Sequence, residues 1–477
     1  MKKIIFLFAL SNYTLAQTWV NVGSPNFTNG SADYIFSATA PNGDPYVVYR
    51  ENSIAAGRVK KFNGKNWIAV GANFSLGDVS CTTMAFDNKG VPYVAYSDEA
   101  DSNKATVMKF DGNNWIPVGS IGFTPGSATY TSIAIDGNGI PYLAFRDQGS
   151  SSYNSWPNGF RASVMKFDGT NWVYVGNPGF SGGSGPYGAL YTSLTIDKNG
   201  LPYVAYSDFS NDSKATVMKF DGTNWVYVGN PGFSSWQSNN TSIVLDSKGS
   251  PYVAYSDRAN NGKATVMMFD GSNWIPVGIA GLTPDIAQYT SLAIDKNDIL
   301  YLAFEDHSQD DKASITKYDG TKWVYVGSPG FSDSAALFTT IAIDNNKGIL
   351  YAAYEDLYNG KTNNPKWDAT VMKFDIVTGI EANEKNYSLS IYPNPVNNIV
   401  TLNIQSSEPK EEFTLLVVSA SGQSVYSEII KDISGTFTKQ INLSALPKGS
   451  YFIELQPTSI NSSGNRSISE IKKIILQ

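Results

Sequence analysis

Aromatic and polar side chains gather in two long segments between predicted β-strands, residues 147–161 (DQGSSSYNSWPNGFR) and 177–191 (NPGFSGGSGPYGALY). Trp236 lies in the next connection of the same kind as 177–191. Aromatic faces stack on the C–H surfaces of sugar rings, and Arg, Asn and Asp groups hydrogen-bond to sugar hydroxyls. The predicted ligand is therefore an extracellular glycan. The predicted ligand contacts are Tyr153, Trp156, Arg161, Tyr187 and Trp236. The alternative is that these aromatic rings only pack against their own loops.

Seven acidic residues each end a short segment of the PYVAYSD type. They are Glu51, Asp98, Asp147, Asp208, Asp257, Asp306 and Asp356. They could form a carboxylate ring for calcium or acid–base chemistry, or cap turns and pair with the Lys found six residues after four of them. Recurrence in every unit favours the structural role. Asp208 with Asp212, or Asp306 with Asp310 and Asp311, could still bind Ca²⁺; no other cofactor is expected.

The single histidine, His307, lies in the polar segment EDHSQDD. It could act as a general base, but a solvated loop histidine is the commoner case. With one His and one Cys, Cys81, the chain has neither a His-rich metal site, nor a Cys/His zinc site, nor an internal disulfide. No phosphate-binding loop and no Ser-His-Asp set can be assembled. No catalytic residues are predicted, and metal ligands are unknown.

The composition excludes other classes of protein. Lys and Arg total 35 against 42 Asp and Glu, which gives a net charge of -7 with no basic block, so no nucleic-acid partner is expected. Aromatic residues make up 13% of the chain, and there are 42 Gly. This composition is typical of a β-rich protein, not of a disordered or coiled-coil chain.

A repeat of about 51 residues positions the candidate segments. Residues 191–229 contain one unit, in which four predicted strands are separated by Asn-Gly and Asp-Gly turns. The last strand begins with a Trp that recurs at Trp19, Trp67, Trp115, Trp172, Trp225, Trp274 and Trp323. Two tight turns lie on one side of each unit. The variable connections lie on the other side, here called the loop face, which includes 147–161 and 177–191.

Seven units with an unused strand predict a closed ring. The seventh unit stops after its third strand, 368–375, while residues 18–23 have the sequence of a fourth strand. We therefore expect residues 17–375 to form an all-β, seven-bladed β-propeller with four-stranded blades, in which the N-terminal strand completes the last blade. A Phe follows the fourth strand in six of seven units, which predicts packing between blades. An open solenoid of hairpins is the alternative.

The N-terminal residues resemble an export signal. Residues 1–16 (MKKIIFLFALSNYTLA) combine two Lys, a short apolar run and small residues, which predicts a signal peptide cleaved after Ala16. The run is too short to span a bilayer, and no other stretch is long enough, so no membrane span is expected. A buried N-terminal strand is the alternative.

The last 90 residues differ from the repeat. They contain no Trp and have alternating apolar residues between Gly, Pro and Asn turns, which predicts a small Ig-like β-sandwich of short strands over 387–477 after a linker at 376–386. The motifs Tyr392-Pro393-Asn394-Pro395, Ser421-Gly422-Gln423, Asn442 to Tyr451 and Lys472-Lys473-Ile474-Ile475 resemble the type A sorting domain of the Bacteroidetes type IX secretion system. The resemblance implies contact with that machinery through 387–477, and release or attachment at the outer cell surface.

Together these features predict a secreted or cell-surface binding protein of the lectin or adhesin type, without catalysis. A secreted polysaccharide lyase or glycoside hydrolase is one alternative, although such lyases generally combine His, Tyr and Arg. A scaffold that binds a surface protein through the same face is another.

Overall fold

In a computed structural model of the chain, the described residues are 18–149, 160–181, 188–358, 366–376, 387–419, 423–457 and 470–477. The predicted signal peptide, 1–16, lies outside them, as do most of the predicted linker and Tyr153, Trp156 and Tyr187. The chain forms two compact units, residues 1–376 and 377–477.

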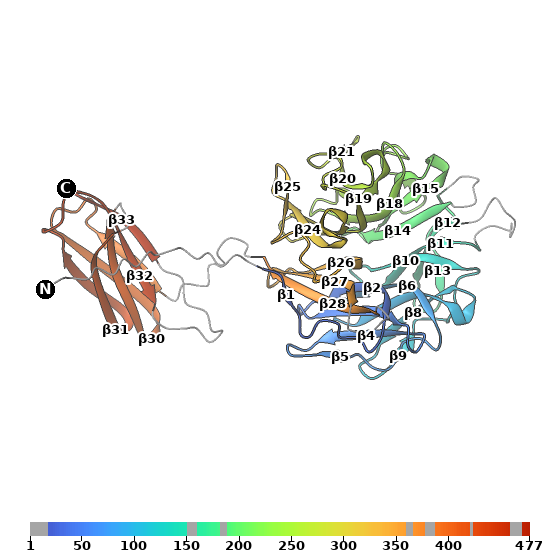
Figure 1. Ribbon diagram of the computed structural model, residues 1–477, viewed down its shortest axis with the longest axis horizontal. Coiled ribbons are helices and arrows are strands. Elements are labelled where there is room, and N and C mark those ends of the chain that lie inside the picture. Colours follow the sequence, from blue (N-terminus) through green and yellow to red (C-terminus); the bar gives the residue numbers. More distant parts are fainter. Residues whose placement is uncertain are drawn as a thin grey trace. The chain divides into compact units, whose positions relative to one another are not determined.

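Within its described residues, the first unit is a ring of seven four-stranded antiparallel sheets (Figure 1). The inner strands are β2 (Ala32–Thr39), β6 (Val79–Phe86), β10 (Ala128–Ile135), β14 (Ala189–Ile196), β18 (Ser238–Leu245), β22 (Ala287–Ile294) and β26 (Ala336–Asp344). The second strands are β3 (Pro45–Glu51), β7 (Pro92–Asp98), β11 (Pro141–Asp147), β15 (Pro202–Asp208), β19 (Pro251–Asp257), β23 (Leu300–Asp306) and β27 (Ile349–Tyr358).

The third strands are β4 (Ala56–Phe62), β8 (Lys104–Phe110), β12 (Arg161–Phe167), β16 (Lys214–Phe220), β20 (Lys263–Phe269), β24 (Lys312–Tyr318) and β28 (Lys366–Asp375). The outer strands are β1 (Val20–Asn21), β5 (Trp67–Ala69), β9 (Trp115–Pro117), β13 (Trp172–Tyr174), β17 (Trp225–Tyr227), β21 (Trp274–Pro276) and β25 (Trp323–Tyr325). Short 3-10 turns follow four second strands: η1 (Glu99–Asp101), η2 (Phe209–Asn211), η3 (Arg258–Asn260) and η4 (His307–Gln309). Blade 1 is β2–β5, and the numbering follows the chain.

The predicted closure of the ring is confirmed. Blade 7 has the strand order β1-β28-β27-β26, and Val20 and Asn21 pair with Lys373 and Met372. The second strands are buried along nearly their whole length, as expected for sheets covered on both faces. The N-terminal strand therefore removes the free edge that the last blade would otherwise expose.

Each Trp at the start of an outer strand binds the preceding blade. Its Nε1 donates to a Val carbonyl there; for Trp19 the acceptor is the Val326 oxygen, at 2.8 Å. The loop Phe residues contact the next Trp, most of them by stacking; Phe331 stacks on Trp19 with the ring centroids 4.1 Å apart. This confirms the predicted role of the repeated Phe in packing between blades. Gly176, with φ at +67°, leaves room for Trp225, because a Cβ atom there would lie 3.1 Å from Trp225 Cδ1.

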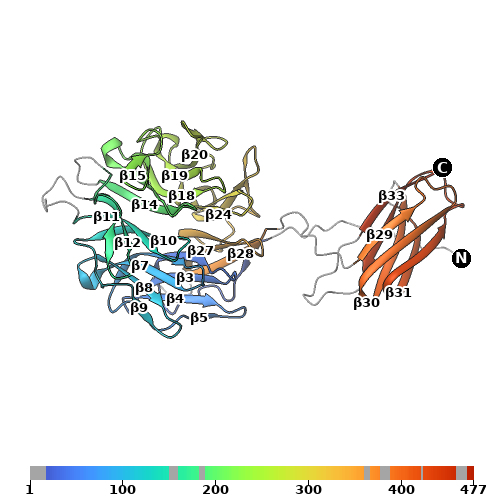
Figure 2. The same cartoon turned by 180° about the vertical axis from the view of Figure 1, so that it is seen from behind.

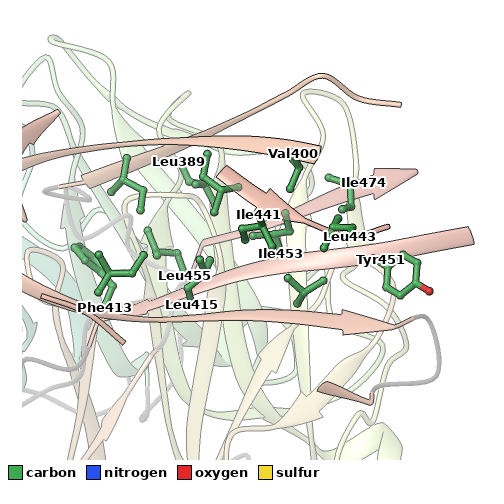
Figure 3. Close-up of a cluster of buried hydrophobic side chains, with 14 of the residues drawn as sticks. Leu389, Val400, Phe413, Leu415, Ile441, Leu443, Tyr451, Ile453, Leu455 and Ile474 are labelled. Atoms are coloured by element: carbon green, nitrogen blue, oxygen red, sulfur yellow. The ribbon is translucent and has the colours of Figure 1, made fainter. Parts of the chain in front are cut away.

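The second unit is one five-stranded antiparallel sheet, with order β29-β30-β32-β33 and β31 beside β30 (Figure 2). Its strands are β29 (Tyr387–Tyr392), β30 (Ile399–Ser419), β31 (Ser424–Asn442), β32 (Gly449–Pro457) and β33 (Glu470–Leu476). The sheet folds over an apolar core that all five strands supply (Figure 3). The expected short strands are wrong for β30 and β31, which stay continuous where the register shifts between Ser406 and Phe413. In the described part of the chain, no helix has the length and apolar character needed to cross a membrane.

Replacing Trp19 tests the closure. In Trp19→Ala, the loss of the Phe331 stack and the Val326 hydrogen bond should lower the free energy of unfolding by about 3–5 kcal/mol. Trp236→Ala, at an exposed ring, should change it by less than about 0.5 kcal/mol. Thermal and urea unfolding of both variants measures the difference, and equal effects would contradict the closure argument.

Candidate functional site

A cavity of about 340 Å³ lies where the seven inner strands surround the axis of the propeller. Each inner strand contributes three consecutive residues to its wall, such as Tyr130, Thr131 and Ser132 in β10. In each strand the register with the second strand shifts at this point, so two residues oppose one and form a β-bulge. The bulges direct one side chain per blade toward the axis.

The first bulge residue of each blade has a positive φ, close to +50°. These residues are Tyr34, Cys81, Tyr130, Tyr191, Asn240, Tyr289 and Phe338. Bulky side chains rarely adopt a positive φ. Holding such a residue in this conformation costs about 1–3 kcal/mol, and residues strained in this way cluster at functional sites. A strained backbone around one axial cavity makes this cavity the leading candidate for the functional site.

The bulge side chains form two aromatic walls. The first wall joins blades 6, 7 and 1: the Phe338 ring lies 4.6 Å from that of Tyr289 and 5.7 Å from that of Tyr34. The second wall is Tyr130 with Tyr191, at 5.1 Å. The smaller residues Cys81 and Asn240 separate the two walls on either side of the axis. The cavity is therefore not seven-fold symmetric.

Threonine hydroxyls connect neighbouring blades below these rings. The Thr290 hydroxyl donates to the Asn240 carbonyl at 2.5 Å, and equivalent bonds join blades 1 to 6 in order. In blade 7, Thr339 donates to Ala336 of its own blade, and blade 1 has Ile35 in place of the Thr. Within the described residues, the series of bonds between blades thus stops on both sides of blade 7.

The residue just before the recurring acidic residue of each second strand varies between blades, and it lies one step closer to the loop face than the bulge does. It pairs with the residue before the bulge, as Glu305 pairs with Gln288. From blade 1 to blade 7 it is Arg50, Ser97, Arg146, Ser207, Ser256, Glu305 and Glu355. The next residue, which is always acidic, is the one that the repeat makes conspicuous in the sequence, and this variable residue was not predicted. Its signal was a change of charge within an otherwise repeated strand.

The two Glu side chains are buried where the threonine bonds are missing. Glu355 is 2% exposed and accepts hydrogen bonds from the backbone N–H groups of Tyr34 and Ile35, while its Oε1 atom has no hydrogen-bond partner. Burial, reinforced by the charge of Asp33, raises the pKa of Glu355 to about 9. Burial and the charge of Asp311 raise the pKa of Glu305 to about 7. Their charges act with burial to raise the pKa of Tyr289 in the cavity.

Cations lie at the same strand position in blades 1 and 3. The Arg146 guanidinium carbon lies 4.0 Å from the centre of the Phe160 ring, and its charge reaches Tyr130 in the cavity. Arg50 forms ion pairs with Asp33 and Asp78. The cavity mouth therefore has buried carboxyl groups on blades 6 and 7 and guanidinium groups on blades 1 and 3.

His307 is not a solvated loop histidine. Its side chain is 27% exposed, and its Nε2 atom lies 2.9 Å from Gln288 Nε2 and 3.6 Å from Glu305 Oε1. Its Nδ1 atom lies 3.3 Å from Asp311 Oδ1. The polar sequence EDHSQDD had suggested full solvation, which is wrong because η4 folds the ring back onto Gln288 at the start of β22.

Two of the five predicted ligand contacts are among the described residues. Arg161 begins β12 opposite Asp147 in blade 3, and Trp236 is 54% exposed in the connection from blade 4 to blade 5. Neither residue lines the axial cavity. Their role in binding stays a prediction, together with those of Tyr153, Trp156 and Tyr187, which lie outside the described residues.

Five of the seven acidic residues that end the second strands cap the following turn, in line with the structural role favoured above: Asp98, Asp147, Asp208, Asp257 and Asp306. Asp208 accepts hydrogen bonds from the Ser210 backbone N–H at 3.0 Å and from the Thr216 hydroxyl at 3.1 Å. The expected ion pairs with Lys are wrong: no described carboxylate of this set lies within ion-pair distance of Lys104, Lys214, Lys263 or Lys312. A hydroxyl of the third strand is the partner instead. The calcium sites proposed at Asp208 and Asp306 stay predictions.

Comparison with protein families identifies the second unit. Residues 390–477 match a family described as the secretion system C-terminal sorting domain. The chain is thus a β-propeller joined to an export domain. Its C-terminal unit belongs to the type IX secretion sorting domains, as its motifs predict, and the protein engages that machinery and is secreted or placed on the outer surface. No curated protein sequence is significantly similar to the chain.

Solved structures with a similar fold are distant. A Dyadobacter fermentans protein of unknown function is 13% identical, with 62% of this chain and 94% of that chain covered and a TM-score of 0.44. Aleuria aurantia lectin, in complex with Fucα1-6GlcNAc, is 16% identical over 64% and 99%, with a TM-score of 0.43. A Penicillium chrysogenum α-L-arabinanase, complexed with arabinobiose, is 13% identical over 76% and 99%, with a TM-score of 0.42. At these values, none of them indicates a ligand or an activity for this chain.

The raised pKa of Glu355 predicts how stability depends on pH. Folded Glu355 keeps a proton that the unfolded chain loses above about pH 4.3, so its contribution to stability falls between about pH 4.3 and pH 9. Glu355→Gln mimics the neutral form and should be more stable than the native protein at about pH 8, by at least about 1 kcal/mol, but not at about pH 4. Thermal unfolding across this range measures the effect.

The control for this experiment is Glu99→Gln, which removes an exposed carboxyl group from the same face. Its unfolding temperature should follow that of the native protein at every pH. If Glu355→Gln behaves in the same way as Glu99→Gln, then Glu355 does not keep its proton in the folded state.

Proposed function

We propose that this secreted propeller binds a carbohydrate at the loop-face mouth of its axial cavity. The observation that supports this proposal is the pair of aromatic walls, Tyr34–Phe338–Tyr289 and Tyr130–Tyr191, held apart by Cys81 and Asn240. Two aromatic surfaces on either side of an axial space suit a ring with two apolar faces, and sugars have such rings.

Size and polarity support the same ligand class. A volume of about 340 Å³ falls at the lower end of the range for small-molecule sites, which suits one or two sugar units. The Tyr hydroxyls and the Asn240 amide offer donors and acceptors for sugar hydroxyls. The rest of a longer glycan would then be bound by the contacts predicted from the sequence, which are Tyr153, Trp156, Arg161, Tyr187 and Trp236.

Exchanging a cavity Tyr for the residue of another blade tests the proposal. Tyr130→Asn copies the bulge of blade 5, where Asn240 has the same positive φ, so the backbone should tolerate it. Loss of the aromatic face should weaken glycan affinity by about tenfold or more. A glycan array finds the ligand, and calorimetry then compares the native protein with the variant.

Tyr227→Asn is the matched control, because Tyr227 is a half-exposed residue of the outer strand β17, away from the cavity. It should leave the affinity unchanged. Absence of any glycan ligand on arrays and on polysaccharide preparations would reject the proposal, as would equal affinities of the two variants.

A second candidate function, a polysaccharide lyase or glycoside hydrolase acting at the same mouth, is favoured by Glu305 and Glu355. Carboxyl groups whose pKa is raised to neutral pH or above are suited to donating a proton to a leaving group. If the protein is an enzyme, incubation with polysaccharides should yield new reducing ends or unsaturated products, and Glu305→Gln should lower the rate at least about a hundredfold. Absence of product from every polysaccharide that the protein binds would exclude this candidate.

A further inference from the structure

Three side chains with metal-ligating atoms meet at the loop-face end of blade 6. Glu305 is the penultimate residue of β23, His307 begins η4, and Asp311 follows that turn. One ligand atom from each residue lies within 4.8 Å of the ligand atoms of the other two. Metal bonds to nitrogen and carboxylate oxygen are about 2.0–2.2 Å long, so one ion could reach all three after small side-chain shifts.

The fold itself does not require these three residues. Blades 4 and 5 have the same 3-10 turn, with the same cap at Asp208 or Asp257. At the position of Glu305 they have Ser207 and Ser256, at that of His307 they have Phe209 and Arg258, and at that of Asp311 they have Ser213 and Gly262. The backbone thus forms this turn without any of the three ligating groups.

Glu305 provides an independent indication of a missing partner. It is 4% exposed, its carboxyl group faces His307, and its Oε2 atom has no hydrogen-bond partner. A carboxylate in this position is costly unless a donor or cation reaches it. A divalent ion between Glu305 and Asp311 would offset this cost and neutralise the two carboxylates.

We propose that Glu305, His307 and Asp311 bind one divalent transition-metal ion, of the Zn²⁺ or Mn²⁺ type. A ring nitrogen among the ligands favours such an ion over Ca²⁺, which prefers oxygen ligands alone. One ring nitrogen of His307 binds the ion. If this is Nδ1, then Nε2–H donates to the Gln288 amide, which would turn its Oε1 atom toward the ring. This site shares Asp311 with one of the calcium sites considered above, but it adds Glu305 and His307 and does not depend on the carbohydrate proposal.

Three ligands from the protein leave at least one position of the ion open. Zinc sites with three protein ligands and one water are typical of ions that also contact a ligand or substrate. The site lies beside Tyr289, whose ring lines the axial cavity and feels the charge of Glu305. The open position would therefore belong to the mouth of that cavity.

Metal titration of the full chain tests this inference. After treatment with EDTA and dialysis, Zn²⁺ is titrated by calorimetry and Co²⁺ by its visible absorption. The native protein should bind one ion per chain. His307→Ala, Glu305→Gln and Asp311→Asn should each weaken binding by at least about tenfold and change the Co²⁺ spectrum.

Asp311→Asn keeps the test valid if the other variants fail to fold. Asp311 is 49% exposed with φ at +62°, and Asn tolerates this backbone as well as Asp does. Glu355→Gln is the matched control, because Glu355 is a buried Glu at the same strand position, followed by Leu357 in place of His. It should leave metal binding unchanged. Absence of saturable binding, or equal binding by the native protein and Asp311→Asn, would overturn the proposal.

Discussion

The contact between each outer-strand Trp and the preceding blade is the interaction on which the propeller depends. The indole donates to a Val carbonyl and packs against the loop Phe of the same blade, so one side chain links two sheets in two ways. The described ring has no disulfide, because Cys81 is its lone cysteine. Its blades are therefore held by this repeated contact, by apolar packing and by the threonine bonds near the axis.

A repeated scaffold leaves certain positions free to change. The caps, the Trp and the glycine before the loop are the same in nearly every blade because each blade meets its neighbour in the same way. The penultimate residue of the second strand is different: it is Ser in three blades, Arg in two and Glu in two. The buried Glu residues lie on blades 6 and 7, and the series of threonine bonds between blades is missing on both sides of blade 7. The candidate site and the broken symmetry thus coincide at the cavity mouth.

The sequence was sufficient to predict the blade count, the strand order and the closure, because each rests on local patterns: Trp spacing, turn residues and an unused strand. It was not sufficient to predict the axial cavity. The repeated Tyr-Thr-Ser at the bulges, as at Tyr130-Thr131, does not distinguish a bulge from a regular strand, and the approach of Glu355 to Tyr34 joins residues 321 positions apart. The caps were recognised, but the Lys partners were wrong because hydroxyls of the third strand lie closer. The aromatic loop residues remain untested as ligand contacts.

The closing strand also has a consequence for biogenesis. A chain delivered from its N-terminus presents Val20 and Asn21 about 350 residues before their partners Met372 and Lys373. Blade 7 cannot be completed until those partners are synthesised, and such long-range strand pairing is slow to form. A polypeptide that ends before β28 would form an incomplete ring with unpaired strand edges. Such a ring is prone to aggregation and proteolysis. Ring completion thus requires a polypeptide that extends at least through Lys373.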